Sequence, residues 1–336
     1  MNEFYQSSQL TNEYKPKLDE WLKQAQTTKE AWSFSWSLID MNKSVMCQFY
    51  GASCLYLKVS KYLSDVPVDD YDVLKNKLLE KLLLYAVNLN KHEQIRLIQR
   101  KLNATLAKLA LYLISDQWPN CVNDMIQTIP NVPISNNEVE TPISTDSVTL
   151  DINNLNKLQL ILIVIDLLTL LPEEYSTLGS IDKQKRTQIH FELKKSFHLI
   201  SEYAIKLFSE FNQTLSASSN NSSLKQLQAK LVENLVKCLT SWVEFGIQFD
   251  ELNIFLDYLF MYIYNEQLFE HTAECLTSLF ANQNNLKYTK SIFKYTPRIL
   301  ELGNLLAKYV QNKDTVILFY FQEKNVLNNE SYFFGI

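Results

Sequence analysis

The sequence contains very little glycine, and this scarcity excludes several common fold classes. Only five glycines occur in 336 residues, far below average usage. Rossmann folds, P-loops and β-barrels need glycine for tight turns and for close approach of the backbone to a ligand. Neither G-x-G-x-x-G nor G-x-x-x-x-G-K-S/T is present. The composition favours helices joined by short polar turns.

The cysteine and histidine patterns that bind metals are also missing. The cysteines are Cys47, Cys54, Cys121, Cys238 and Cys275. They form no C-x-x-C pair and their number is odd, which predicts reduced thiols rather than a disulfide or zinc framework. The four histidines form no H-E-x-x-H motif and no pair four residues apart. We therefore predict no metal and no cofactor.

No arrangement typical of an enzyme is present. No serine lies in a G-x-S-x-G elbow, and the remaining candidates are Glu173 and Glu174 in the stretch LLTLLPEEY (residues 167–175). Adjacent helical residues point about 100° apart, so these carboxylates would not converge on one reacting atom. Because Pro172 disfavours continuation of a helix, the stretch predicts a helix end or bend, with both glutamates at a solvated rim. We predict no catalytic residue and no enzymatic activity.

Long apolar runs and a strong positive charge are absent as well. The most apolar stretch, residues 158–171, contains Asp166 and is too short to span a bilayer, which takes about 20 residues. The first residues show no apolar region typical of a secretory signal. The formal net charge of −5 argues against a basic nucleic-acid-binding protein. The sequence therefore predicts a buried helix, no membrane insertion and no direct nucleic-acid binding.

Apolar residues recur at helical spacing along nearly the whole chain. The expected helices are 17–26, 30–40, 45–62, 71–89, 94–113, 120–129, 153–171, 183–215, 223–245, 251–264, 266–281 and 288–310. The five tryptophans fall on apolar stripes or at helix ends, which predicts core positions. Gly246, directly after one of these helices, can adopt the left-handed conformation that ends it. No hairpin signal interrupts the pattern, so the predicted class is all-α.

The spacing of these helices predicts their organisation. Two helices in every 40–50 residues, joined by short turns, are typical of a helical-hairpin solenoid, and a compact helical bundle is the alternative. Residues 131–151 carry four acidic residues, two prolines and no basic residue, which predicts a flexible acidic insertion between paired helices. Residues 216–223, SASSNNSS, are expected to form a polar linker.

Several motifs, in order, resemble one protein family. They are DEWLKQAQ (19–26), AWSFSWSL (31–38), QFYGASCLYLKVSKYLSD (48–65), TLAKLALYLISDQWPNCVNDMI (105–126), LLTLLPEEY (167–175) and KCLTSWV (237–243). They resemble the N-terminal module of the importin-β superfamily of nuclear transport receptors (karyopherins). The importin-13-like branch is the most similar, and the transportin-SR branch is next. The resemblance runs from about residue 4 to about Asp314.

The resemblance implies a fold, partners and a location. The fold would be a right-handed superhelical α-solenoid of HEAT-type repeats, similar to armadillo repeats. The protein would carry protein cargo through nuclear pores by contact with nucleoporins. Import into the nucleus is implied, with export as a second direction, so the chain would shuttle between cytoplasm and nucleus. The GTP form of the GTPase Ran would bind the concave side of the first repeats. A helical-repeat scaffold that does not depend on Ran remains the alternative.

The resemblance also suggests where Ran would bind. By position, it implies the polar residues of helices 45–62 and 94–113 and of the end of the segment 153–174. The candidates are Lys58, Lys61, Asp65, Arg96, Gln99 and Asn103. The sequence does not determine which polar stripe faces the partner.

Two departures from the family pattern qualify the domain prediction. Family members are much longer, and residues 315–336 no longer resemble the helix that would complete the seventh repeat. We expect an N-terminal solenoid over residues 1–314, with about six and a half repeats. A divergent tail would follow over residues 315–336. A truncated isoform or an incomplete gene model would explain such a tail.

Overall fold

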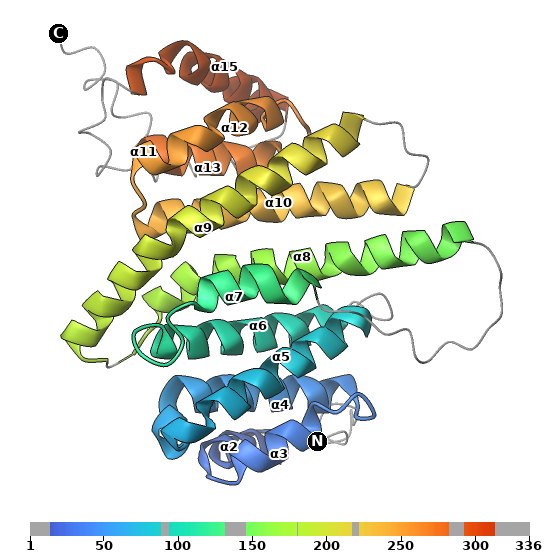
Figure 1. Cartoon of the computed structure of the whole chain (residues 1–336), viewed down its shortest axis with the longest axis vertical. Helices are drawn as coiled ribbons and strands as arrows, with labels where there is room; N and C mark the ends of the chain where they lie inside the picture. Colours follow the sequence, from blue (N-terminus) through green and yellow to red (C-terminus); the bar gives the residue numbers. More distant parts are fainter. Residues whose placement is uncertain are drawn as a thin grey trace. The chain divides into compact units, whose positions relative to one another are not determined.

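The computed structural model describes residues 14–88, 94–131, 146–179, 181–216, 222–281 and 292–312. Within these ranges every regular element is helical (Figure 1). The α-helices are α2 (Tyr14–Thr27), α3 (Ala31–Leu38), α4 (Val45–Tyr62), α5 (Tyr71–Asn88), α6 (Gln94–Leu113), α7 (Cys121–Thr128), α8 (Asp146–Ser176), α9 (Lys183–Ser216), α10 (Ser222–Phe245), α11 (Phe249–Leu252), α12 (Leu256–Tyr262), α13 (Phe269–Ala281) and α15 (Thr296–Asn312). The 3-10 turns are η1 (Leu63–Asp65), η2 (Val68–Asp70), η3 (Ile129–Asn131) and η4 (Asn253–Phe255). The predicted all-α class is confirmed.

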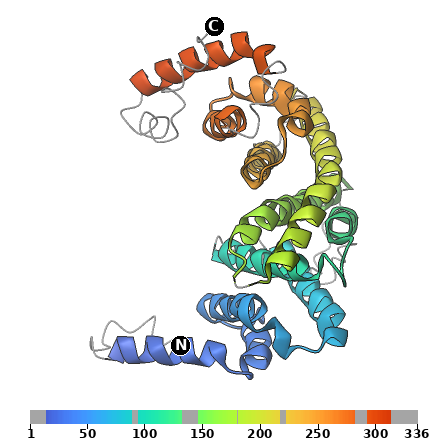
Figure 2. The same ribbon diagram turned by 90° about the vertical axis from the view of Figure 1, so that its left-hand side faces the viewer.

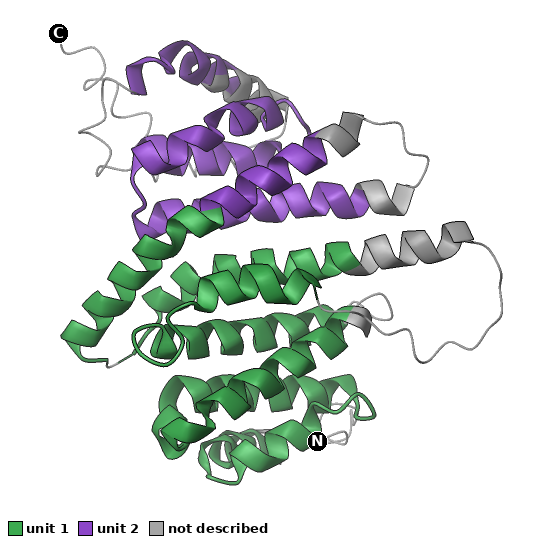
Figure 3. Cartoon of the chain, viewed as in Figure 1, with its two compact units in different colours: residues 1–200 green, residues 201–336 purple. Residues whose placement is uncertain are grey.

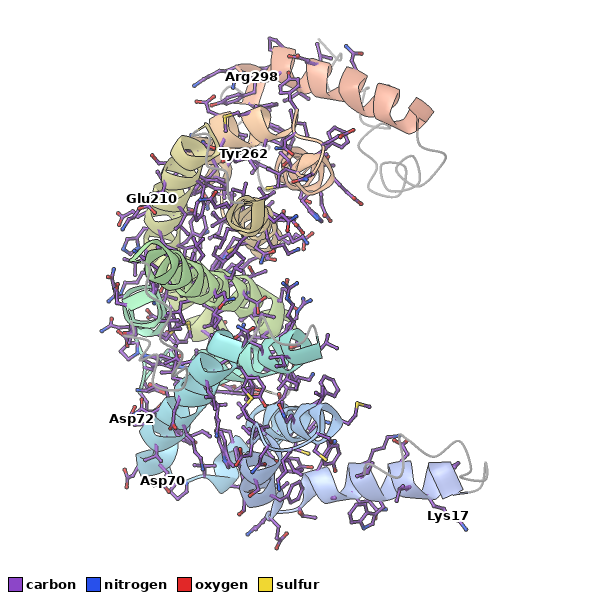
Figure 4. The ribbon with its side chains drawn as sticks, turned by 90° about the vertical axis from the view of Figure 1, so that its right-hand side faces the viewer. Lys17, Asp70, Asp72, Glu210, Tyr262 and Arg298 are labelled. Carbon is purple, nitrogen blue, oxygen red and sulfur yellow. The ribbon has the colours of Figure 1, made fainter. Side chains whose placement is uncertain are left out.

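The chain forms two compact units, residues 1–200 and residues 201–336 (Figure 3). In unit 1, α6 packs between α4 and α8, and these three helices form one layer. Helices α5 and α7 lie on one side of this layer (Figure 2), where α5 contacts α6 and α8 and α7 contacts α8. The successive pairs α3–α4, α5–α6 and α7–α8 are stacked helical hairpins, as expected for HEAT-type repeats.

The close contact between α3 and α4 depends on a glycine. A Cβ atom on Gly51 would lie 2.8 Å from Leu38 Cβ and 2.9 Å from the carbonyl oxygen of Ser35. A side chain at this position would therefore push the two helices apart. The start of α4 is fixed by Ser44, whose side chain accepts a hydrogen bond from the backbone N–H of Cys47 (3.4 Å), as an N-cap serine does.

The core of unit 1 contains the most apolar stretch of the chain. Ile163, Val164, Ile165 and Leu167 on α8 are each at most 1% exposed. Burial of consecutive residues means that α8 is covered on several sides, which confirms the buried helix predicted for residues 158–171. No helix within the described residues is both long and apolar enough to cross a membrane.

The core of unit 2 contains a cluster of aromatic side chains. Helix α10 packs against α13, and Phe208 on α9 stacks on Tyr258 with ring centroids 5.2 Å apart. Phe208 also contacts the rings of Phe255 and Tyr262. Gly246 follows the last residue of α10 with φ of 103°, the left-handed conformation that the sequence predicts.

Most predicted helix boundaries agree with the structure. Helices 45–62 and 94–113 are confirmed to the residue. The helix predicted over residues 251–264 is instead divided among α11, η4 and α12, and α8 begins at Asp146, inside the segment expected as an insertion. Residues 132–145 and 313–336 lie outside the described residues. The domain of 1–314, the insertion at 131–151 and the tail at 315–336 therefore remain predictions.

The prediction for LLTLLPEEY is wrong in part. Helix α8 does not end at Pro172 but continues to Ser176, and only Glu173 is exposed, whereas Glu174 is buried. Proline removes one backbone hydrogen bond. Burial of Leu171 and Pro172 and an ion pair between Glu174 and Lys108 (2.9 Å) stabilise the helix across this gap.

The core position predicted for one tryptophan is also wrong. Trp21 on α2 is 62% exposed, while its neighbour Leu22 is 6% exposed and faces the core. Adjacent helical residues point in directions about 100° apart, and the main packing partners of α2 among the described elements are α3 and α4. The packing of this helix therefore covers a narrower stripe than its apolar residues suggest.

Candidate functional site

The first half of α6 and the neighbouring side of α4 together form an exposed surface. Leu97 on α6 is 62% exposed, and Arg96 and Arg100 beside it are also exposed. Phe49 on α4 is 40% exposed, and Tyr56 follows it two helical turns later on the same side of the helix. We call Phe49, Tyr56, Leu97, Arg100 and Lys101 the α4–α6 patch.

The two helices are joined within this patch by a cation–π contact. The ammonium group of Lys101 lies 4.3 Å from the centroid of the Tyr56 ring. Such a contact fixes the direction of a flexible lysine side chain. The patch therefore presents cationic, aromatic and aliphatic groups together on neighbouring helices.

A buried network below the patch holds Tyr56 in place. The Tyr56 hydroxyl donates to Glu174 Oε2 on α8 (2.8 Å). Lys108 on α6 donates to the same carboxylate oxygen (2.9 Å) and to Thr177 Oγ1 (2.6 Å). Burial and, to a smaller extent, the Glu174 carboxylate together raise the pKa of Tyr56 to about 12. Tyr56 therefore remains a hydrogen-bond donor at neutral pH, and Glu174 connects α4, α6 and α8.

A second polar contact connects α6 and α8 nearer their middle. Asn103 Nδ2 donates to Asp166 Oδ2 (2.5 Å). Burial raises the pKa of Asp166, although the hydrogen bond from Asn103 and the charge of Arg100 act in the opposite direction. Asn103 Oδ1 is buried and has no hydrogen-bond partner among the described residues. The hydrogen-bonding capacity of the buried Asn103 amide is therefore only partly used among the described residues.

The structure divides the six candidates of the sequence analysis into two groups. Lys58, Gln99 and Asn103 are buried, so they present no surface to a partner in this conformation. Lys61, Asp65 and Arg96 are exposed. Contact of any of them with Ran stays a prediction.

The burial of Lys58 has a clear structural reason. Its ammonium group donates to Asp65 Oδ2 (3.0 Å) and to the carbonyl oxygen of Thr28 (3.2 Å). It also lies 4.3 Å from the centroid of the Tyr62 ring and 5.5 Å from that of Trp32. A buried ammonium needs such partners, so Lys58 joins α4 to the turn before α3 and to η1.

Lys61 lies in a groove at the C-terminal end of α4, away from the α4–α6 patch. The groove has a volume of about 640 Å³ and includes Tyr71, Tyr112, Asp116 and Lys185 in its lining. Lys61 and Arg96 therefore occupy different parts of unit 1. The structure does not bring the exposed candidates into one site.

Reasoning from the sequence chose helices α4 and α6 but missed every residue of the α4–α6 patch. Leu97, Arg100 and Lys101 carry a detectable signal, because an apolar residue with cations three and four positions later occupies one side of a helix. That side is the one that the apolar stripe of α6 leaves exposed. The role of Tyr56 has no such signal, because its partners Lys101 and Glu174 are distant in sequence.

Nothing in the described residues resembles a catalytic or metal centre. Glu173 is exposed and Glu174 is bound to Lys108, so the two carboxylates do not form an acid–base pair. No group of three or more histidine, cysteine, aspartate or glutamate side chains in the described part of the chain could hold a metal ion. The arrangement is suited to contact with another protein.

Comparison with known proteins agrees with this view. The family model described as "Exportin 1-like protein" matches residues 96–276. Importin-13 of Mus musculus is 27% identical over 310 residues, which cover 90% of this chain and 28% of the relative. Importin-13 of Bos taurus is 27% identical over 297 residues, 88% of this chain and 26% of the relative. Importin-13 homolog A of Dictyostelium discoideum is 24% identical over 235 residues, 68% of this chain and 18% of the relative.

The extent of these matches identifies the family and also sets a limit. The chain spans about a quarter of the length of the Mus musculus and Bos taurus relatives. The activity of a whole receptor therefore does not transfer to it directly. The family model, however, covers more than half of the chain. The chain therefore belongs to the exportin 1-like family within the importin-β superfamily, whose members are nuclear transport receptors rather than enzymes.

Proposed function

We propose that this chain acts as the N-terminal part of a nuclear transport receptor and binds Ran in its GTP form through the α4–α6 patch. The observation that carries the proposal is the combination of the exposed Phe49, Leu97 and Arg100 with the half-buried pair of Tyr56 and Lys101. Arginine and tyrosine are enriched among the residues that dominate protein–protein affinity. Membership of a transport-receptor family makes a regulatory GTPase the natural partner for such a surface.

The nucleotide dependence follows from the physics of small GTPases. Their switch segments are ordered by contacts with the γ-phosphate and its magnesium ion, and they are released on hydrolysis. A fixed patch that contacts ordered switch segments binds the GTP form better, because binding the GDP form would also require ordering them. Lys101, held over Tyr56, and Tyr56, held by Glu174, provide such a fixed surface.

The remaining partners follow from the same proposal. Protein cargo would bind and be released in response to Ran, because linkage between two binding sites is reciprocal. Passage through nuclear pores would require contact with nucleoporins, and the receptor would then be found in both cytoplasm and nucleus. Import is the direction that the names of the relatives suggest, and export is a second direction.

The experiment measures the affinity of the chain for Ran bound to a non-hydrolysable GTP analogue and for Ran bound to GDP. We expect the GTP form to bind at least about tenfold more tightly, which corresponds to about 1.4 kcal/mol. The variant Arg100→Glu/Lys101→Glu should lose about tenfold or more in affinity for the GTP form. A matched control, Lys17→Glu/Lys29→Glu, changes the net charge equally at two exposed lysines outside the patch and should bind like the wild type.

The original candidates are tested in the same assay. Lys61→Glu and Arg96→Glu alter exposed side chains, so each compares one candidate with the α4–α6 patch without disturbing the core. Equal binding to both nucleotide states, or no binding to either, would refute the Ran proposal and favour the Ran-independent scaffold. Binding that is unchanged in the patch variant but lost in Lys61→Glu would place the contact at the groove instead.

A further inference from the structure

The first part of α9 has one side in the core and one side exposed. Ile189, Leu193, Phe197 and Ile200 form a stripe that is at most 2% exposed, at the spacing of one helical face. All four lie in unit 1, to which this part of α9 belongs (Figure 3). Phe191 points away from this stripe and is 61% exposed. An exposed phenylalanine opposite the buried face has no role in packing α9 onto its unit.

This exposed side is strongly basic, although the whole chain is acidic. Residues 183–198 contain five lysines and arginines but only one carboxylate, whereas the formal net charge of the chain is −5. Lys194 and Lys195 follow Phe191 at the positions one helical turn later, and Lys183 lies two turns before it. We call Lys183, Phe191, Lys194 and Lys195 the α9 face.

The neighbouring charged groups do not neutralise the α9 face. The single carboxylate, Glu192, accepts a hydrogen bond from Gln188 (3.0 Å) and lies 4.0 Å from Lys195. Within the described residues, no carboxylate lies at ion-pairing distance from Lys183 or Lys194. Lys183 and Lys195 are exposed and Lys194 is half-buried, so the positive charge of the α9 face is open to solvent mainly at Lys183 and Lys195.

The fifth cation of this segment has a different environment. The guanidinium group of Arg186 donates to the carbonyl oxygen of Leu178 (3.3 Å) and lies 5.2 Å from the Tyr175 ring centroid. These contacts turn Arg186 toward the end of α8. Within the described part of unit 1, no hydrogen bond or ring contact ties the side chains of Lys183, Lys194 and Lys195 to another helix, so they remain available to a partner.

We propose that the α9 face is a docking site for an acidic segment of a partner protein that carries an apolar side chain between its carboxylates. The carboxylates would pair with Lys183, Lys194 and Lys195, and the apolar side chain would cover Phe191. Complementary charge of this kind steers association and selects the partner. A single exposed aromatic residue gives an apolar side chain of the partner one place to bind.

The dimensions of the face set the length of the segment. Lys183 and Lys194 are eleven residues apart, about 16 Å along a helix axis. An extended peptide covers that distance with about five residues, so about eight residues suffice with both ends included. A membrane surface fits less well, because lipid binding needs a broad apolar face. Nucleic acid fits less well because of the acidic net charge.

This proposal is independent of the Ran proposal. The α9 face lies on a different element from the α4–α6 patch, and recognition of an acidic segment involves no nucleotide. Binding at the α9 face should therefore be the same in the Arg100→Glu/Lys101→Glu variant as in the wild type. Failure of one proposal leaves the other standing.

The test uses the full chain and a fluorescein-labelled peptide of about eight aspartate and glutamate residues with one central leucine. Fluorescence anisotropy gives its affinity at low and at high salt. We expect Lys194→Glu/Lys195→Glu to weaken binding about tenfold or more, and high salt to weaken binding to the wild type. Phe191→Ser should weaken binding about threefold for the leucine peptide and leave binding of a peptide with glycine in its place unchanged.

Matched controls separate the face from general electrostatics. Lys17→Glu/Lys29→Glu changes the charge equally, and Val73→Ala removes apolar surface from a residue that is 63% exposed on α5; both should bind the peptide like the wild type. Phe191→Gln provides a second polar replacement with good helix propensity, and circular dichroism verifies that each variant is folded.

Three results would overturn the proposal. One is that Lys194→Glu/Lys195→Glu binds the acidic peptide with the same affinity as Lys17→Glu/Lys29→Glu. Another is equal binding of a peptide with asparagine and glutamine in place of the acids. The third is tighter binding of a single-stranded RNA or of phosphatidylserine vesicles than of the acidic peptide, which would assign the face to another class of partner.

Discussion

The ion pair between Lys108 and Glu174 should contribute more to the stability of unit 1 than the other ion pairs of this unit. The Lys108 side chain is 2% exposed and that of Glu174 is 11% exposed. Lys108 Nζ donates to the carboxylate, to the carbonyl oxygen of Glu174 (3.1 Å) and to Thr177. By contrast, the side chains of Lys23 and Asp19, which pair on α2, are each more than half exposed and should contribute little.

The expected loss depends on which partner is removed. Breaking a buried pair by removing one partner typically costs about 3–5 kcal/mol, because an uncompensated charge is left in the interior. Glu174→Leu leaves the ammonium of Lys108, which is only 2% exposed, without its carboxylate partner, so this loss should fall near the upper end of the range. Lys108→Met leaves a carboxylate that still accepts hydrogen bonds from Tyr56 and Thr177. The loss of stability in this variant should therefore fall near the lower end of the range.

Removing both charges should cost less than the two single losses together. In Lys108→Met/Glu174→Leu no unpaired charge remains, and an apolar replacement of a buried pair is often close to neutral. Tyr56 loses its acceptor in this variant, which costs about 1–3 kcal/mol. We expect the double-mutant cycle to give a coupling of about 2 kcal/mol or more.

The assay must report on unit 1 alone, because a chain with two units need not unfold in one step. Four of the five tryptophans, Trp21, Trp32, Trp36 and Trp118, lie in unit 1, and Trp242 lies in unit 2. In a Trp242→Phe background, tryptophan fluorescence therefore follows the urea unfolding of unit 1. Single losses below about 1 kcal/mol, or losses that add without coupling, would refute the reasoning.

Three further predictions concern the packing and charges of both units. Asp166→Asn should raise the melting temperature at neutral pH, because burial raises the pKa of this carboxyl group and so penalises its ionised form, and because an amide can donate to the unpartnered Asn103 Oδ1. The gain should disappear as the pH falls through the raised pKa, where the wild-type carboxyl group is protonated; a gain that persists in acid would contradict this. Gly51→Ala should destabilise unit 1 by about 1–3 kcal/mol, because its new methyl group would lie 2.8 Å from Leu38 Cβ, and an unchanged urea midpoint would show that the helices can separate at no cost. In unit 2, burial acts to raise the pKa of Glu233, but hydrogen bonds from two lysines outweigh it and the pKa is lowered. Glu233 therefore contributes stability above its unfolded pKa that is lost as the pH falls through the folded value. Glu233→Gln should reduce the acid dependence of unfolding, followed as the part of the tryptophan signal that is absent in the Trp242→Phe background, and an identical pH profile would argue against the contribution.

The helices of this protein could be predicted well because their cause is local. A stripe of apolar residues at a spacing of three and four is visible in the sequence, and helices 45–62 and 94–113 match the structure to the residue. Errors arose where distant contacts decide the outcome. Continuation of α8 through Pro172 depends on packing and on Lys108, which lies 66 residues before its partner Glu174.

The candidate site was predicted less well for the same reason. Lys58, Gln99 and Asn103 are polar residues on the predicted helices, and polarity suggested exposure. Their burial depends on partners from other elements, such as the carbonyl of Thr28 for Lys58 and Asp166 for Asn103. No pattern within one helix contains that information.

The sequence by itself determined the all-α class, the pairing of helices into hairpins and the family, because periodicity, turn residues and motif order are properties of the linear chain. Only the tertiary structure decided which charged groups are buried and which are open to a partner. In LLTLLPEEY, two adjacent glutamates have opposite environments: Glu173 is exposed, and Glu174 connects three helices. The physical reason is that a charge is stable in the interior only where other helices bring its partners to it.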